Sequence, residues 1–152
     1  MKLTVALCLL AAASPSLGQA SSYRRTCDTI KHWQITAGHR LSARCGGPRG
    51  RFPTELDLNL CYGNRDGVLV HADNGRAFST CTIHSISTET GYIDATCPRD
   101  NGQRIPANIG TDDFIQNENG RLTCFGHLGP CNGCLSPEGE NGTAPAPKKR
   151  IA

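Results

Sequence analysis

The sequence lacks most of the features that indicate several common functions. A formal net charge of +3 over 152 residues is too weak to favour nucleic-acid binding. After the first 20 residues no stretch is apolar enough to enter a membrane, and no segment carries a 3.6-residue apolar period. Aromatic residues make up only 5%, and the single tryptophan, Trp33, is expected in the core or on a strand surface. We therefore expect a mainly β protein without nucleic-acid binding or membrane insertion.

Sequence motifs of enzymes are also missing. Neither G-x-S-x-G nor H-E-x-x-H occurs, and the histidines do not lie at metal-ligand or triad-like spacing. The five are His32, His39, His71, His84 and His127. We predict that the protein is not an enzyme. A small secreted hydrolase whose histidines meet only in the fold is a minor alternative.

The chain contains an internal repeat centred on residues 56–69, which read LDLNLCYGNRDGVL. Asn64, Gly67 and Leu69 are matched later by a second set, Asn117, Gly120 and Leu122. Upstream, LSARC at 41–45 is matched by IDATC at 93–97. Two copies are too few for a solenoid. The pattern predicts one compact domain over 21–134, with repeat one at about 23–76 and repeat two at about 77–128.

Alternating apolar residues and turn signals predict the secondary structure. Strands are expected at 27–33, 40–45, 56–60, 68–71, 82–86, 92–97 and 121–125, with a short helical turn at 60–64. Turns are expected at 37–39, 46–50, 64–67, 73–75, 101–102 and 119–120. The 73–75 turn is also the hinge between the repeats.

Both ends of the chain have compositions that differ from the domain. A lysine, an apolar run and small residues up to Ala20 predict a signal peptide at 1–20, and hence a secreted, extracellular protein. Proline and charged residues predict a disordered tail at 135–152. Asn141 in that tail begins an Asn-Gly-Thr glycosylation acceptor.

Cysteine content indicates disulfides. Removing the signal peptide takes away Cys8 and leaves eight of nine cysteines, an even number that is typical of small secreted domains. The repeat favours one bridge in each copy, Cys27–Cys45 and Cys81–Cys97. Two further bridges of open pairing are expected among Cys61, Cys124, Cys131 and Cys134. A zinc site at Cys124, His127, Cys131 and Cys134 is a weaker alternative, so we predict neither metal nor cofactor.

The duplicated Asn-x-x-Gly-x-Leu turns, the cysteine pair in each repeat and LDLN at 56–59 resemble the cyanovirin-N homology family over about 23–125. The additional cysteine, Cys61, is a feature in which the chain resembles fungal members of this family. The resemblance implies two pseudo-symmetric halves, each a three-stranded sheet plus a β-hairpin exchanged from the other repeat. One half would combine about 23–59 with 117–125, and the other 64–71 with 78–109. It also implies a lectin that binds mannose-rich glycans or glycoproteins without metal, as a monomer or a domain-swapped dimer.

Two candidate sugar sites follow from this resemblance. The hinge-side site would contain Gly63, Asn64, Asp66, Thr80, Arg99 and Gln103. A weaker termini-side site would contain Arg25, Thr26, Asn117, Glu118 and Asn119, because Gly46 and Pro48 replace expected polar residues there. Amides, carboxylates and guanidinium groups are the partners that vicinal hydroxyls need.

Two alternatives stay open. Asn and Asp are also the residues that tight turns favour, so the turn residues could be purely structural. The protein could also be a secreted interaction or effector protein that has kept the fold without sugar binding, since function resides in sites rather than folds.

Overall fold

The structure is a computed structural model that describes residues 21–28, 39–87, 90–112 and 114–134. The predicted signal peptide, Trp33, the turn residues Ala37 and Gly38, the tail and Asn141 lie outside the described residues. Within the described part, no helix has the length and apolarity needed to cross a bilayer.

The first half of the molecule is built around a three-stranded antiparallel sheet. Its strands are β2 (Cys27–Asp28), β3 (Arg40–Gly47) and β4 (Gly50–Asp57). A hairpin from repeat two, β10 (Gln116–Glu118) and β11 (Arg121–Cys124), packs on this sheet. The backbone N–H of Leu122 donates to Oγ1 of Thr54 at 3.2 Å across this contact. Repeat two therefore completes the half that repeat one begins.

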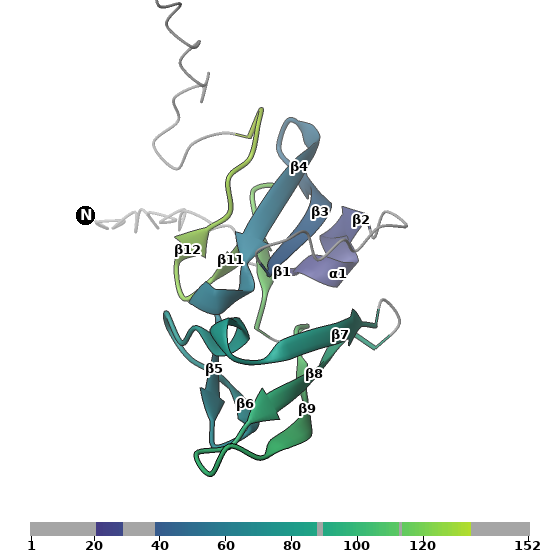
Figure 1. Cartoon of the computed structure of the whole chain (residues 1–152). Coiled ribbons are helices and arrows are strands. Elements are labelled where there is room, and N and C mark those ends of the chain that lie inside the picture. The colour runs from purple at the N-terminus through teal and green to yellow at the C-terminus, as the bar shows by residue number, and fades with distance from the viewer. Residues whose placement is uncertain (1–20, 29–38, 88–89, 113, 135–152) are drawn as a thin grey trace, which may run out of the picture.

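The second half repeats this arrangement with the roles exchanged (Figure 1). Its sheet contains β7 (Thr82–Ile86), β8 (Tyr92–Pro98) and β9 (Arg104–Gly110), all from repeat two. The hairpin of β5 (Tyr62–Arg65) and β6 (Val68–His71) comes from repeat one, and β6 packs against β9. The mainly β class and the two exchanged hairpins agree with the expectation.

Short elements connect these sheets. They are β1 (Ser21–Ser22), α1 (Tyr23–Thr26), the 3-10 turns η1 (Leu58–Leu60) and η2 (Ala77–Ser79), and β12 (His127–Leu128). The sheet β1-β10-β11-β12 links both ends of the domain. One continuous core runs through both halves, and its largest fully buried side chains include Tyr23, Leu41, Leu58, Tyr62, Phe78, Ile93, Ile115 and Leu122.

Several predicted boundaries were wrong. The strand expected to reach Leu60 ends at Asp57, whose carboxylate accepts from the N–H of Asn59 at 2.9 Å and starts η1. The helical turn therefore comes before Cys61, and Tyr62 begins a strand. The predicted loop 46–50 is shorter, because β3 and β4 pair as far as Gly47 and Gly50. The strand expected to reach Phe125 ends at Cys124.

Four disulfides join the eight cysteines. Cys27–Cys45 and Cys81–Cys97 are the pairs that the repeat predicted. The other two are Cys61–Cys124, which joins the repeats, and Cys131–Cys134. The zinc alternative is wrong for this structure, since all three of its cysteines are in disulfides and offer no thiolate.

Residues 126–134, which we call the C-terminal extension, lie against the first half. The N–H of Gly129 donates to the Leu122 carbonyl at 2.8 Å, and Cys131 pairs with Thr54 in an isolated bridge. A Cβ at Gly129 would overlap the carbonyl oxygen of Glu55, so only glycine fits this approach. The extension therefore forms part of the folded domain.

Candidate functional site

Each half ends in a tight hairpin turn with the same backbone conformation. Asp66 and Gly67 connect β5 to β6 with φ values of 48° and 87°. Asn119 and Gly120 connect β10 to β11 with φ values of 52° and 94°. Positive φ at both central residues is the signature of a type I′ turn, which favours Asn-Gly and Asp-Gly. The turn chemistry predicted from the sequence therefore fixes both tips.

Asn64 docks the first tip onto the neighbouring sheet. Its Oδ1 accepts from the N–H of Gly67 at 2.9 Å, and its Nδ2 donates to the carbonyl of Pro98 at 2.8 Å. The side chain thus closes the turn and holds it against the end of β8. These two hydrogen bonds are structural, and they use the amide oxygen and one of the two amide hydrogens of Asn64.

Asn117 has the equivalent duty in the other half. Its Oδ1 accepts from the N–H of Gly120 at 2.9 Å, while Nδ2 donates to the Gly46 carbonyl and to Oγ1 of Thr26, both at 2.9 Å. The residue is 6% exposed. Both amide hydrogens are used, so the contacts of Asn117 do not support the prediction that its side chain binds a ligand.

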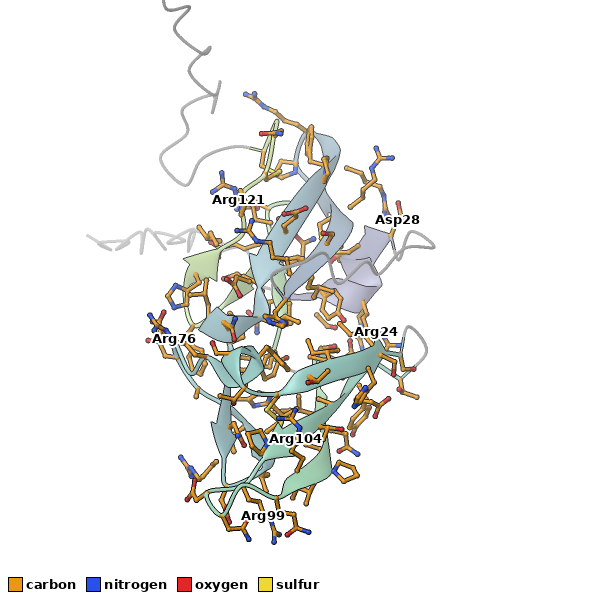
Figure 2. The ribbon with its side chains drawn as sticks, viewed as in Figure 1. Arg24, Asp28, Arg76, Arg99, Arg104 and Arg121 are labelled. Atoms are coloured by element: carbon orange, nitrogen blue, oxygen red, sulfur yellow. A yellow bond between two sulfur atoms is a disulfide. The ribbon has the colours of Figure 1, made fainter. Side chains whose placement is uncertain are left out.

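The hinge-side end brings four predicted residues together: Asn64, Asp66, Arg99 and Gln103. Oδ1 of Asp66 accepts from the N–H of Asp100 at 3.0 Å, joining the two hairpin tips. The N–H of Arg99 donates to the Gln103 carbonyl at 2.8 Å within the β8–β9 loop. Figure 2 shows the Arg99 side chain at this far end of the molecule. Except for half-buried Asn64, these side chains are exposed, and they present carboxylate, guanidinium and amide groups together.

Gly63 and Thr80 do not join this group. Gly63 is buried, and a Cβ there would lie 3.0 Å from Cβ of Ala72. Thr80 is exposed, and its hydroxyl donates to the Ala77 carbonyl at 3.3 Å. Among the described residues, no hydrogen bond or ion pair connects Thr80 with Asp66 or Arg99.

Two residues at or near this site were missed from the sequence. Asp100 adds a second exposed carboxylate beside Asp66. The Arg104 guanidinium donates to the carbonyls of Thr80 and Thr96 at 3.2 and 2.9 Å, and to Oγ1 of Thr82 at 3.1 Å. Figure 2 shows Arg104 over the sheet, where it holds β7, β8 and β9 together. A single arginine in a sequence gives no sign of such a position.

The termini-side end is filled by backbone. A Cβ at Gly47 would lie 2.5 Å from the Asn119 carbonyl oxygen, so the β3–β4 tip and the β10–β11 turn are in direct contact. Arg25, Pro48, Glu118 and Asn119 are exposed around this contact. Thr26 is half-buried and accepts from Asn117. This end therefore offers fewer convergent polar groups than the hinge-side end.

Within the described part of the chain, no group of three or more histidine, cysteine or acidic residues could hold a metal ion. Burial raises the pKa of Tyr23 and of Tyr62 well above the ordinary tyrosine value. Both hydroxyls lie in the core, so neither serves the exposed ends.

Comparison with known proteins identifies the family. The family model of the CVNH domain matches residues 23–123. The chain belongs to the CVNH family. A search of curated proteins finds no match.

Solved CVNH structures share this fold. A microvirin:mannobiose complex is 27% identical, with a TM-score of 0.56 over 68% of this chain and 98% of that chain. GzCVNH from Gibberella zeae is 23% identical, with a TM-score of 0.53 over 67% and 95% of the two chains. An MoCVNH3 variant in complex with (N-GlcNAc)4 is 15% identical, with a TM-score of 0.59 over 69% and 97%. The last two likenesses concern the fold alone.

Proposed function

We propose that this CVNH protein is a secreted lectin that binds mannose-containing oligosaccharides at its hinge-side end. The observation that carries the proposal is the exposed group of Asp66, Arg99 and Gln103, which two hairpins hold together through the Asp66–Asp100 hydrogen bond. The microvirin structure, solved with mannobiose, supports this ligand class. Glycoproteins that carry such glycans are the expected partners.

The chemistry of the group matches a sugar. Vicinal hydroxyls both donate and accept, so a carboxylate, a planar guanidinium and an amide can each form hydrogen bonds with them. Each hydrogen bond contributes only about 1 kcal/mol after water is displaced, and bonds to charged groups about twice that. Binding at one such exposed site is therefore weak, and it requires no metal.

The termini-side end is the weaker candidate. The Asn117 side chain is occupied by hydrogen bonds to Gly120 and to the Gly46 carbonyl. The close contact of Gly47 with Asn119 places backbone atoms, rather than polar side chains, at this end. Four disulfides suit a protein exported to an oxidising compartment, in line with the predicted signal peptide.

The variant Asp66→Asn tests the proposal. Asn keeps the φ preference of the type I′ turn and can accept from Asp100, but it lacks the negative charge. Isothermal titration of the oxidised mature protein with mannobiose should show affinity reduced by roughly tenfold, with an unchanged melting temperature. Asn119→Asp, the reverse exchange at the matching position of the other turn, is the control and should bind like the wild type.

The possible results separate the candidate functions. Equal affinity of Asp66→Asn and the wild type would place any sugar site elsewhere. Absence of heat with mannobiose, larger mannose oligosaccharides and (N-GlcNAc)4 would contradict the lectin proposal and favour the interaction-protein alternative. Turnover of a glycan or nucleic acid would favour the hydrolase.

A further inference from the structure

A third hairpin turn breaks the preference that the other two obey. Phe125 and Gly126 connect β11 to β12 between the paired residues Cys124 and His127, with φ values of 47° and 81°. The first position of the other two turns holds Asp66 and Asn119, which tolerate this region. A bulky residue with positive φ is an outlier that folding preferences do not explain.

Burial does not compensate for this conformation. Phe125 is 47% exposed, one of three large apolar residues exposed in the described part of the chain. Residues other than glycine that are held in the left-handed region cluster at active sites, ligand clamps and switch regions. Phe125 is therefore strained at its backbone while about half of its ring surface stays open to solvent.

The phenyl ring is nevertheless held in place. It meets Phe114 edge to face, with ring centroids 4.6 Å apart. Phe114 in turn stacks on His71, at 4.1 Å and an interplanar angle of 11°. Such pairs favour fixed offset or perpendicular geometry. The Phe125 ring is thus held by Phe114, which is itself held by His71.

Polar side chains stand beside this ring in a shallow cleft of about 260 Å³. Gln116 and Glu118 alternate along β10 and so share one face of the strand, and Thr123 lies opposite Gln116. All three line the cleft together with Phe114 and Phe125. Within the described part of the chain, the side chains of Gln116 and Glu118 make no hydrogen bond, so their amide and carboxylate can serve a ligand.

We propose that this cleft is a separate carbohydrate subsite, in which a pyranose ring stacks its apolar C–H face on Phe125 while Gln116 and Glu118 bind its hydroxyls. A sugar has both an apolar face and a hydroxyl edge, which is the combination that this cleft presents. At about 260 Å³ the cleft is smaller than the pockets that hold drug-sized ligands, so it suits a small ligand. The inference rests on the proposed lectin function. It uses none of the hinge-side residues and shares only Glu118 with the predicted termini-side site.

Phe125→Asn is the decisive variant because it gives the turn its preferred residue and removes the ring. We expect an unchanged or higher melting temperature, together with roughly tenfold weaker binding of mannobiose or (N-GlcNAc)4 when measured in the Asp66→Asn background. Phe125→Tyr, which keeps a ring, should bind like its parent. Gln116→Ala should also weaken binding and provides a second test that leaves the turn intact.

The outcomes distinguish the two proposals. If neither glycan binds the wild type, the lectin function fails and this subsite fails with it. If Asp66→Asn by itself abolishes all glycan binding, no second site remains, so the hinge-side site stands and the subsite is overturned. Equal affinity of Asp66→Asn with and without Phe125→Asn would overturn the subsite as well. A lower melting temperature for Phe125→Asn would show that the ring is structural and would also overturn it.

Discussion

Nε2 of His127 lies 2.7 Å from Oδ1 of Asp73, so the C-terminal extension reaches the linker between the two repeats. Nδ2 of Asn74 lies 3.4 Å from the same nitrogen. The Cys61–Cys124 disulfide joins repeat one to repeat two at a second place. An exchange of halves between two molecules must separate the repeats of each chain, and this disulfide holds them together.

We therefore predict that the oxidised protein is a monomer and that the double variant Cys61→Ala, Cys124→Ala forms half-exchanged dimers at high concentration. The bond spans 63 residues, for which the chain-entropy model gives about 4 kcal/mol of stabilisation, so the variant should also melt at a lower temperature. Light scattering after size exclusion measures the mass. Cys131→Ala, Cys134→Ala removes a bond spanning only 3 residues and is the control that should stay monomeric. Dimers of the oxidised wild type would contradict the prediction.

The two turn asparagines should differ in their contribution to stability. Asn117 is buried and makes three hydrogen bonds, whereas Asn64 makes two and is half-buried. Replacing Asn117 by Ala should lower the free energy of unfolding by about 3 kcal/mol, and replacing Asn64 by about half as much. Urea unfolding of both variants measures this. Equal losses in the free energy of unfolding would contradict the prediction, because they would mean that the two asparagines stabilise their turns to the same extent.

Two buried tyrosines should respond in opposite ways to the loss of their hydroxyl groups. The Tyr62 hydroxyl is buried and has no hydrogen-bond partner in the described part of the chain, while the Tyr23 hydroxyl lies 2.8 Å from Oγ1 of Thr111. Tyr62→Phe removes an unsatisfied group, so its free energy of unfolding should be unchanged or higher by about 1 kcal/mol. Tyr23→Phe should lose about 1 kcal/mol. Destabilisation by Tyr62→Phe would indicate a bound water or an unrecognised partner.

Alkaline pH should destabilise the protein through the same two residues. Burial is the main cause that raises the pKa of Tyr23 and Tyr62 above the ordinary value of about 10. Above that pH the unfolded chain releases these protons while the folded protein keeps them, so stability present below about pH 10 is lost as pH rises further. Urea unfolding at several values between about pH 8 and 11 should show this decline. Tyr62→Phe should show a shallower decline, and an identical slope would contradict the assignment.

The repeat made much of the fold predictable. Residues such as Asn64 and Gly67 recur with their spacing because each closes the same type of turn, and the intra-repeat disulfides follow from the same duplication. The boundary at Asp57 was not predictable from alternation, since its side-chain cap decides it. The pairing of Cys61 with Cys124 depends on how the repeats interleave, which no local pattern records.

The candidate site was less predictable than the fold. Asn64 and Asn117 look alike in the sequence, and only the burial and the second donor bond of Asn117 separate them. Phe125 looks like the last residue of an apolar strand, and its exposure depends on where β11 stops. Nothing in the sequence distinguishes Asp100 from the other acidic residues, because its place beside Asp66 depends on the contact between the two hairpin tips.

The exchanged hairpins also set the order of events during synthesis. The sheet made by β3 and β4 emerges from the ribosome first, but the hairpin that covers it ends only at Cys124. Local hairpins form within microseconds, whereas this pairing must wait for nearly the whole domain. We therefore expect a nascent chain that stops after repeat one to lack a stable fold, because the hairpin that covers its sheet has not been made.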